Sequence, residues 1–350
     1  MNLKSKFIID YFKLFFWIKT KTWNIFSRRV YTYSKYQKFF WLLYISIIYV
    51  YFILVKISLY LFKNDLAKIY GYGFLYRCLN TFNRFLQGSE YIKKIKELLI
   101  KNKSLNKYLS EKFLNEISFY SSSKKIKISK RSYKETKYEK IFRSLSRDKS
   151  ILIIGSAPVE LNRDLKTKIE RHDYVLVFNP RNLTIIEKII PKRKKIAFYR
   201  GEYSKTINKK DLRNNLFCIF KVIKTKELFK NDTQNRMIIR PLNEDRLGQT
   251  NGIQDIIFDL LNWEFSQIEV IGCDLLLTRG NNKGYRKESE GKIFYPSTFY
   301  SHPPELQFSF LKKIKNSFPN RIIFDKKLNN IINEGLDKYL LNMENLSKNS

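Results

Sequence analysis

The segment SILIIGSAP, from Ser150 to Pro158, joins a short apolar run to a turn of small residues. An apolar run of this length, rich in β-branched residues, predicts a strand that is buried on both faces. Runs of the same type recur six times: YVLVF at 174, KIAFY at 195, LFCIF at 216, RMIIR at 236, IEVIG at 268 and RIIFD at 321.

Helical patterns lie between several of these runs: LNRDLKTKIE at 161, GIQDIIFDLLNW at 252 and ELQFSFLKKIKN at 305. Buried strands that alternate with helices predict an α/β fold with a mostly parallel sheet flanked by helices. We therefore expect a single Rossmann-like domain over residues 148–335. Ligands of such sheets bind beyond the carboxyl ends of the strands, where the strand order reverses.

The chain of 350 residues carries a strong excess of positive charge. Lys and Arg number 67 against 32 Asp and Glu, a formal net charge of +35. Such an excess attracts nucleic acid, anionic lipid head groups or acidic substrates. The abundance of Lys, Ile, Asn, Tyr and Phe also fits an AT-rich genome. We assign part of the excess to that bias and the rest to a negatively charged membrane surface.

Three cysteines, Cys78, Cys218 and Cys273, lie far apart and form no C-x-x-C pair. Neither a zinc knuckle nor a redox pair is predicted, and a reducing compartment is expected. Cys273 ends an apolar run, so we expect its side chain to be buried.

The N-terminal region divides into an arm, an apolar segment and a stem. Residues 1–38 are basic and aromatic, with Asp10 as the only acid, and lack the pattern of a secretory signal. Residues 39–62 are apolar apart from Lys56. Three interpretations stay open for them: a membrane span, a helix lying in the bilayer interface, or a core helix of a soluble protein. Residues 63–147 are expected to form a basic helical stem in all three cases.

We expect the region before residue 148 to attach the chain to an anionic membrane surface. The basic arm favours an N-terminus inside the cell, and a single span over residues 39–62 would then place the second half of the chain outside. Residues 125–150 look too polar to build a core, and residues 336–350 are expected to be a polar tail.

Small or polar residues follow several predicted strands. The turn Gly155-Ser156-Ala157 lets backbone N–H groups approach a phosphate or a sugar ring. Asn179 can bond a base or ribose through its amide. Thr250-Asn251-Gly252 begins a helical pattern that can hold an anion, and Gly272-Cys273-Asp274 follows the run at 268. Each segment alone is equally consistent with a tight turn or a helix cap, so their order carries more information than any one of them.

The chain has two histidines, His172 and His302. His172 stands at the start of a predicted strand and is expected at the surface. His302 lies in the segment FYSHPPE, where the prolines favour the start of a helix. Imidazole is well suited to accept a proton near neutral pH, and Glu305 can pair with it or cap the helix. A structural role for a histidine in a loop is the alternative.

The ordered set of these motifs resembles the bacterial sialyltransferases, especially small membrane-associated enzymes that build lipooligosaccharide, and more distantly the animal sialyltransferases. The resemblance covers about residues 150–335. The family's first strand and small-residue turn are matched by Ile151 to Pro158, with Val159 where a Ser is usual. The family's D-x-V and strand-ending Asn are matched by Asp173-Tyr174-Val175 and Phe178-Asn179.

Three further motifs complete the resemblance. Thr250-Asn251-Gly252 matches the family's S/T-S/T-G helix start, with Asn in place of Ser. Gly272-Cys273-Asp274 matches the G-x-D that follows a strand. Phe299-Tyr300, His302 and Glu305 match an aromatic, the catalytic His and a later acid. The family's Tyr after G-x-D is replaced by Leu276, which leaves Tyr285, or alternatively Tyr295, to hold the donor phosphate.

The resemblance implies an inverting transfer of sialic acid from CMP-sialic acid to a hydroxyl of a surface glycan. His302 would be the base, and Tyr285 would stabilise the departing phosphate with backbone N–H groups near Gly155–Ala157. Asn179, residues 250–252 and Asp274 would bind the donor. The family does without a metal, and no Asp-x-Asp occurs here, so we expect neither a metal nor another cofactor. The expected partners are the donor, a glycan acceptor and anionic lipid, with self-association suggested by the family. A bacterial donor sugar would be made inside the cell. An interfacial helix, or a pair of turns within residues 39–62, would keep both halves of the chain inside, so we expect the cytoplasmic face of the inner membrane.

Three alternatives remain open at this stage. Leu276 leaves room for a different nucleotide-sugar donor on the same scaffold. The net charge allows a nucleic-acid-binding protein, although no nucleic-acid module is recognisable and the apolar segment argues against it. The changed Ser and Tyr positions allow a non-catalytic membrane-associated protein that has kept the fold.

Overall fold

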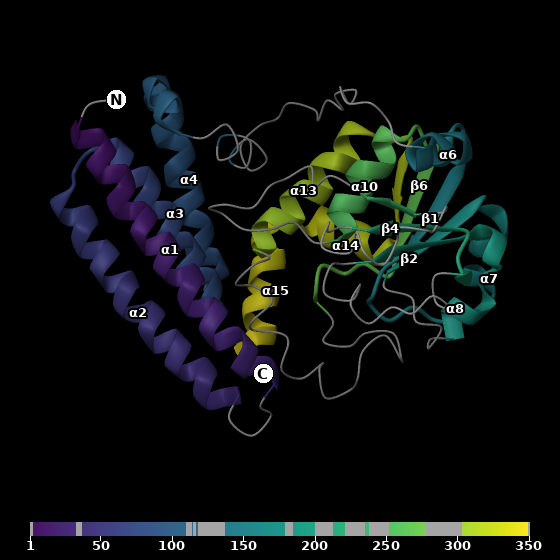
Figure 1. The fold of residues 1–350 in the computed structure, drawn as a ribbon, viewed down its shortest axis with the longest axis horizontal. Coiled ribbons are helices and arrows are strands. Elements are labelled where there is room, and N and C mark those ends of the chain that lie inside the picture. The colour runs from purple at the N-terminus through teal and green to yellow at the C-terminus, as the bar shows by residue number, and fades with distance from the viewer. Residues whose placement is uncertain are drawn as a thin grey trace.

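The computed structural model has a helical part and an α/β part that lie side by side (Figure 1). It describes residues 3–32, 37–109, 114, 117, 137–178, 185–199, 213–220, 235–237, 252–277 and 303–348. The helical part consists of α1 (Leu3–Thr32), α2 (Gln37–Leu61), α3 (Asp65–Thr81), α4 (Phe85–Lys101) and the 3-10 helix η1 (Lys103–Tyr108). The α/β part begins at residue 137.

Seven strands form one sheet in the order β5-β4-β3-β2-β1-β6-β7. Every neighbouring pair is parallel, and β1 lies between β2 and β6. The strands are β1 (Ser150–Ile154), β2 (Tyr174–Phe178), β3 (Lys195–Tyr199), β4 (Phe217–Phe220), β5 (Asn235–Met237), β6 (Gln267–Ile271) and β7 (Ile322–Phe324). The predicted α/β fold with a parallel sheet flanked by helices is confirmed.

Helices cover both faces of the sheet, which explains the uninterrupted apolar runs. Side chains alternate between faces along a strand, so a strand buried on both sides needs apolar residues throughout. Leu152 and Ile154 pack with residues of α7 (Arg163–Arg171) and α8 (Ile185–Ile189) on one face. Ile151 and Ile153 belong to the cluster on the other face. That face is covered by α6 (Lys137–Ser146), α10 (Gly252–Asn262), α13 (Pro304–Ser317), α14 (Lys326–Glu334) and α15 (Leu336–Lys348).

Two segments differ from the expectation that they would be polar and outside the core. The expected tail instead contains α15, whose Tyr339, Leu340 and Met343 are buried in the main cluster. The Tyr339 hydroxyl donates to the Leu275 carbonyl oxygen at 2.9 Å. In α6, Phe142 is fully buried between aromatic rings of the sheet and of the segment after α10. Both helices carry a narrow apolar stripe among many polar residues, and a single stripe is enough for a surface helix.

The helical part has its own apolar core, formed by α1 to α4. Lys19, one of the basic residues of the arm, is buried in it rather than exposed. Its ammonium group donates to Thr81 Oγ1 at 3.1 Å and to the Arg77 carbonyl oxygen at 3.2 Å. Burial, with the nearby Arg77, lowers the pKa of Lys19 to about 7. The arm therefore forms a helix with one side packed in this core, and its exposed side carries both basic and large apolar residues.

The two parts touch through α4 on one side and α13 and α15 on the other (Figure 1). Glu344 of α15 accepts a hydrogen bond from the backbone N–H of Leu86 at 2.8 Å, at the first turn of α4. Phe85, also in α4, is buried in the core cluster of the α/β part. Among the described residues, α2 contains the one helix long and apolar enough to cross a bilayer, Phe39–Leu61.

Candidate functional site

The strand order reverses between β1 and β6, which places a switch point at the centre of the sheet. From β1 the chain builds outward to β5, and it then returns to the other side of β1 as β6. The loops that leave β1 and β6 therefore diverge, and the crevice between them is the usual ligand site of such sheets. The turn Gly155-Ser156-Ala157 and the loop Gly272-Cys273-Asp274 are these two loops.

The two loops are in direct backbone contact. A Cβ atom on Gly155 would lie 2.1 Å from the Gly272 carbonyl oxygen, so only glycine fits there. The Gly155 N–H donates to the Ile271 carbonyl oxygen at 2.8 Å, and the Ala157 N–H donates to the Gly272 carbonyl oxygen at 3.0 Å. We expected these N–H groups to face a ligand. They instead hold the loops together, so that part of the expectation is wrong.

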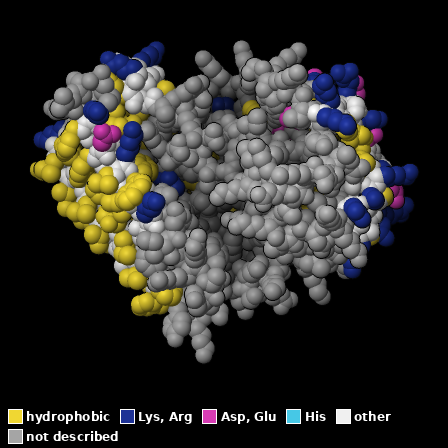
Figure 2. Space-filling model, in the orientation of Figure 1, with side chains coloured by type: hydrophobic (Ala, Val, Ile, Leu, Met, Phe, Trp, Pro, Cys, Tyr) yellow, Lys and Arg dark blue, Asp and Glu magenta, His cyan; other side chains and the backbone are white. Residues whose placement is uncertain are grey.

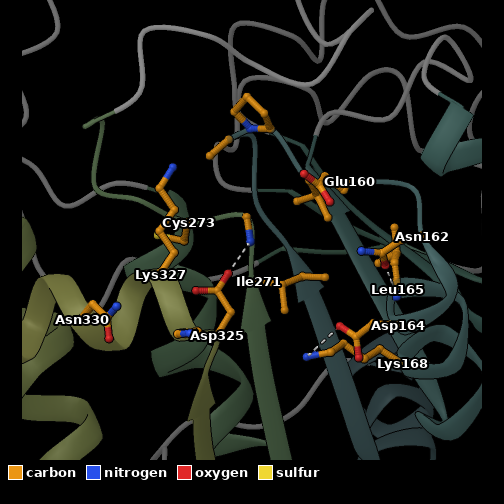
Figure 3. A pocket seen from close by; sticks show the side chains of 15 residues that line it. Glu160, Asn162, Asp164, Leu165, Lys168, Ile271, Cys273, Asp325, Lys327 and Asn330 are labelled. Carbon is orange, nitrogen blue, oxygen red and sulfur yellow. Dashed lines mark hydrogen bonds and ion pairs between the residues drawn. The ribbon is translucent and has the colours of Figure 1, made fainter.

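A pocket of about 770 Å³ opens beside the joined loops. Figure 3 shows its two walls, one formed by the start of α7 and the other by the start of α14. Asn162 caps α7 by accepting from the Leu165 N–H at 3.0 Å. Asp325 caps α14 by accepting from the Leu328 N–H at 2.8 Å, and its second oxygen accepts from the Gly272 N–H at 3.0 Å.

Charged side chains of both signs surround this pocket. Lys327 donates to the buried carboxylate of Asp274 at 3.0 Å, which links α14 to the loop after β6. On the other wall, the Lys168 ammonium group lies 3.7 Å from Asp164 Oδ2. Two helix amino-termini and three lysines, Lys168, Lys326 and Lys327, line a pocket that also contains three acids: Glu160, Asp164 and Asp325. The lining therefore offers both cationic and acidic groups to a polar ligand.

Asp274 is used by its own loop. Its Oδ1 accepts from the Leu276 N–H at 3.1 Å, in the manner of an Asp-stabilised turn. Leu275 and Leu276 both adopt left-handed backbone conformations, with φ of 52° and 71°. Such a conformation is costly for a leucine, and strained backbone is often found at functional loops. Leu276, which the resemblance to sialyltransferases places where that family has Tyr, is therefore part of a sharp turn.

A buried network of charged side chains joins α7, which lines the pocket, to strand β6. Glu269 of β6 accepts from Lys168 at 2.7 Å and from Arg171, both in α7. Burial raises the pKa of Glu269, but the hydrogen bonds from Lys168 and Arg171 outweigh it and hold the pKa below its ordinary value. His172 lies 3.5 Å from the same carboxylate and is 1% exposed. The expectation of a surface His172 is wrong, and burial lowers the pKa of His172, which keeps it neutral at neutral pH.

Glu305 lies away from the pocket, in the first turn of α13. Its side chain is 4% exposed, and its Oε2 accepts no hydrogen bond from the residues that the structure describes. Burial raises the pKa of Glu305 to about 8, against the opposite pull of Lys96 and Lys93 in α4. Pro303 occupies the cap position of α13, so Glu305 is not the cap. Glu305 lies between α13 and the helical part.

Five of the expected site residues lie outside the described residues: Asn179, Thr250, Asn251, Tyr285 and His302. Gly252, the first residue of α10, is described. A Cβ atom on it would lie 3.1 Å from the Phe198 ring and 3.3 Å from the Phe178 ring, at the carboxyl ends of β3 and β2. The start of α10 therefore reaches the same edge of the sheet as the two joined loops.

The sequence analysis missed the contribution of α7 and α14 to the site. The signal was present, because Asn162 and Asp325 are capping residues three positions before a buried leucine. Among the residues described, no three of His, Cys, Asp and Glu are grouped as a metal site would require. All three cysteines are buried, as expected for Cys273. No protein-family model, curated protein or solved structure matches this chain.

Proposed function

We propose that the chain is an inverting glycosyltransferase with a Rossmann-like nucleotide-binding domain, which moves sialic acid from CMP-sialic acid to a glycan hydroxyl. One observation carries the proposal. Two of the ordered motifs, Gly155-Ser156-Ala157 and Gly272-Cys273-Asp274, are far apart in sequence, yet they touch at the switch point of the sheet. Nucleotides bind at this place in open parallel sheets.

The pocket chemistry supports a nucleotide donor. A nucleoside monophosphate leaving group carries negative charge, and helix amino-termini with nearby lysines favour anions. The starts of α7 and α14, with Lys326 and Lys327, offer these features on either side of one opening. Asn179 and residues 250–252 are proposed to hold the cytidine and the sialyl carboxylate, and Asp274 keeps the loop after β6 in place.

The proposed reaction is a single displacement. The acceptor oxygen forms a bond to the anomeric carbon while the bond from that carbon to the phosphate oxygen breaks, and CMP leaves with the electron pair. The acceptor proton passes to His302, which acts as general base. Tyr285 donates a hydrogen bond to the departing phosphate. Glu305, with a pKa of about 8, retains its proton at neutral pH and is more suited to donate a hydrogen bond than to form an ion pair with His302.

The test is release of CMP from CMP-sialic acid by the purified full-length chain. A fragment from residue 145 is unsuitable, because Phe85 and the Leu86 N–H contribute to the α/β part from α4. We expect release by the wild type, a loss of about a hundredfold or more in His302→Ala, and unchanged CMP binding in that variant. Tyr285→Phe and Tyr295→Phe form a matched pair, of which only the first should slow release. EDTA should have no effect.

Release that His302→Ala leaves unchanged would exclude this histidine from the chemistry. The leading alternative is a different nucleotide-sugar donor, favoured by the left-handed Leu276 where the resembling family has Tyr. A screen of UDP-, GDP- and CMP-sugars for hydrolysis distinguishes the two. Absence of both binding and hydrolysis for every donor would leave a non-catalytic role.

A further inference from the structure

The outward face of α2 is mostly apolar, with Ser46 and Lys56 as its exposed polar residues between 39 and 61. Tyr44, Ile48, Phe52 and Val55 point inward and are buried against the rest of the helical part. On the outer side, large apolar residues are between 38% and 78% exposed: Leu42, Leu43, Tyr49, Val50, Ile53, Leu54, Ile57, Tyr60 and Leu61. A monomeric soluble protein rarely exposes so continuous an apolar surface, so this face needs a partner.

The neighbouring helix α1 extends the same surface. Phe7, Leu14 and Trp17 are at least half exposed. Figure 2 shows hydrophobic side chains gathered over the α1 and α2 side of the molecule, opposite the α/β part, with basic residues near them. We call these exposed residues of α1 and α2 the apolar face.

Basic residues interrupt and border the apolar face. Lys56 is exposed within α2, with its ammonium group 4.8 Å from the Phe52 ring centroid. On α1, Lys21 lies 5.6 Å from the Trp17 ring. Long basic side chains can lie along an apolar surface and reach lipid phosphates at its edge, and Trp favours the same level of the bilayer. A second copy of this chain would bring like charges together, whereas an anionic lipid surface complements them.

We propose that the apolar face lies in the interfacial region of an anionic lipid bilayer, with α1 and α2 parallel to the membrane plane. The α/β part then stands above the bilayer, on the side of the helical part away from the lipid (Figure 1). This attachment is independent of the proposed transferase activity. It selects one of the three interpretations that the sequence leaves open for residues 39–62.

The packing of α1 on α2 opposes a membrane-spanning α2. The Tyr11 hydroxyl lies 2.7 Å from Ser58 Oγ, and the Phe15 ring lies 6.1 Å from the Tyr51 ring. These contacts show that α1 runs antiparallel to α2. Asp10 and Lys13 of α1 therefore lie beside the second half of α2. Both are more than half exposed and lie 4.0 Å apart. A spanning α2 would take this exposed pair toward the hydrocarbon, which is costly, whereas an in-plane α2 leaves it near water.

Three exposed positions on α2 can report its orientation. Phe39, Val50 and Leu61 are 61%, 57% and 69% exposed. Successive positions are eleven residues apart, so all three project in nearly the same direction, with about 16 Å along the helix between neighbouring positions. Single cysteines at these positions, in the full-length chain, would carry a bimane label in vesicles of phosphatidylcholine and phosphatidylglycerol. The native cysteines are buried, which limits background labelling. Quenching by lipids with spin labels at known depths then measures each position.

We expect wild type to bind these vesicles, and the three labels to report similar, shallow depths. A profile with Val50 deep and both ends shallow would overturn the proposal in favour of a span. No binding to anionic vesicles would overturn it altogether, including the case where the face is covered by a second copy in solution.

The double variant Val50→Ser/Ile57→Ser removes apolar area from the face without touching the core of the helical part. We expect its vesicle binding to fall by about tenfold or more. Leu341→Ser is the matched control, because Leu341 is 40% exposed in α15, within the α/β part, and its binding should equal that of wild type. Equal binding by the double variant would contradict the proposal. CMP release in detergent should be the same for all three proteins, so failure of the membrane proposal and failure of the transferase proposal remain separate.

Discussion

At the scale of single residues, Gly155 determines how close the two loops of the site can come. A Cβ atom there would meet the Gly272 carbonyl oxygen at 2.1 Å and its carbon at 2.8 Å, and backbone atoms cannot rotate away. We expect Gly155→Ala to lower the free energy of unfolding by about 1–3 kcal/mol, measured by urea denaturation, because β1 and β6 must shift apart. CMP release should fall as well.

Gly88 of α4 provides the control for this substitution. A Cβ atom on Gly88 would lie 3.3 Å from Asn80 Oδ1, and alanine is favoured over glycine within a helix by about 1 kcal/mol. The gain in helix propensity and the close contact with a side-chain oxygen oppose each other, so Gly88→Ala should change the free energy of unfolding by less than about 1 kcal/mol. A Gly155→Ala protein as stable as Gly88→Ala would show that the contact between the loops is not tight.

At the scale of elements, the ion network of Glu269 fixes α7 against β6. Lys168 and Arg171 of α7 both donate to this carboxylate, which is 1% exposed as a residue. Removing one partner of a buried ion pair leaves the other charges uncompensated, so Glu269→Gln should lower the free energy of unfolding by about 3–5 kcal/mol. The control is Glu264→Gln, whose carboxylate is 49% exposed and 3.7 Å from Arg143 and Arg147. It should lose less than about 1 kcal/mol. Similar losses in both variants would contradict this role for Glu269.

The strands could be predicted from the sequence alone, whereas several helices could not. Runs such as ILII at 151 and YVLVF at 174 are apolar at every position because helices cover both faces of the sheet, and this pattern is readable without any contact information. Helix α15 was missed because Leu340 and Met343 supply a narrow stripe within a polar segment. Only the partner surfaces show that such a stripe is buried, and those surfaces come from segments distant in sequence.

The site shows the same division between local and distant information. The small-residue turn at Gly155 and the loop at Gly272 were predicted from local patterns, and the structure joins them. The N–H groups of Gly155 and Ala157 donate hydrogen bonds to carbonyl oxygens of residues more than a hundred positions later in the sequence. No local sequence pattern indicates these hydrogen bonds. The burial of His172 likewise depends on Glu269 in another strand.

At the scale of the whole molecule, Glu305 couples the α/β part to the helical part. Its carboxyl is buried where α13 meets α4, and burial is the main reason that its pKa is raised from 4.5 to about 8. The charged groups that act on it come from α4 and α15: Lys96 and Lys93, which lower the pKa, and Asp337 and Glu90, which raise it further. Folding therefore favours the protonated carboxyl. The contribution of Glu305 to the free energy of unfolding is fully present below about pH 4.5 and is lost as the pH rises toward 8.

Glu305→Gln removes that titration while keeping the shape of the side chain. We expect the variant to equal wild type in melting temperature near pH 5 and to exceed it by a few degrees at pH 8, because only the wild type must then bury a charge or bind a proton. Glu334→Gln, at an exposed position on α14, should follow the wild-type curve at every pH. A Glu305→Gln protein less stable than wild type at pH 8 would mean that the carboxylate is charged and paired, with Lys96 of α4 as the candidate partner. The contact between α13 and α4 would then include an ion pair rather than a neutral carboxyl.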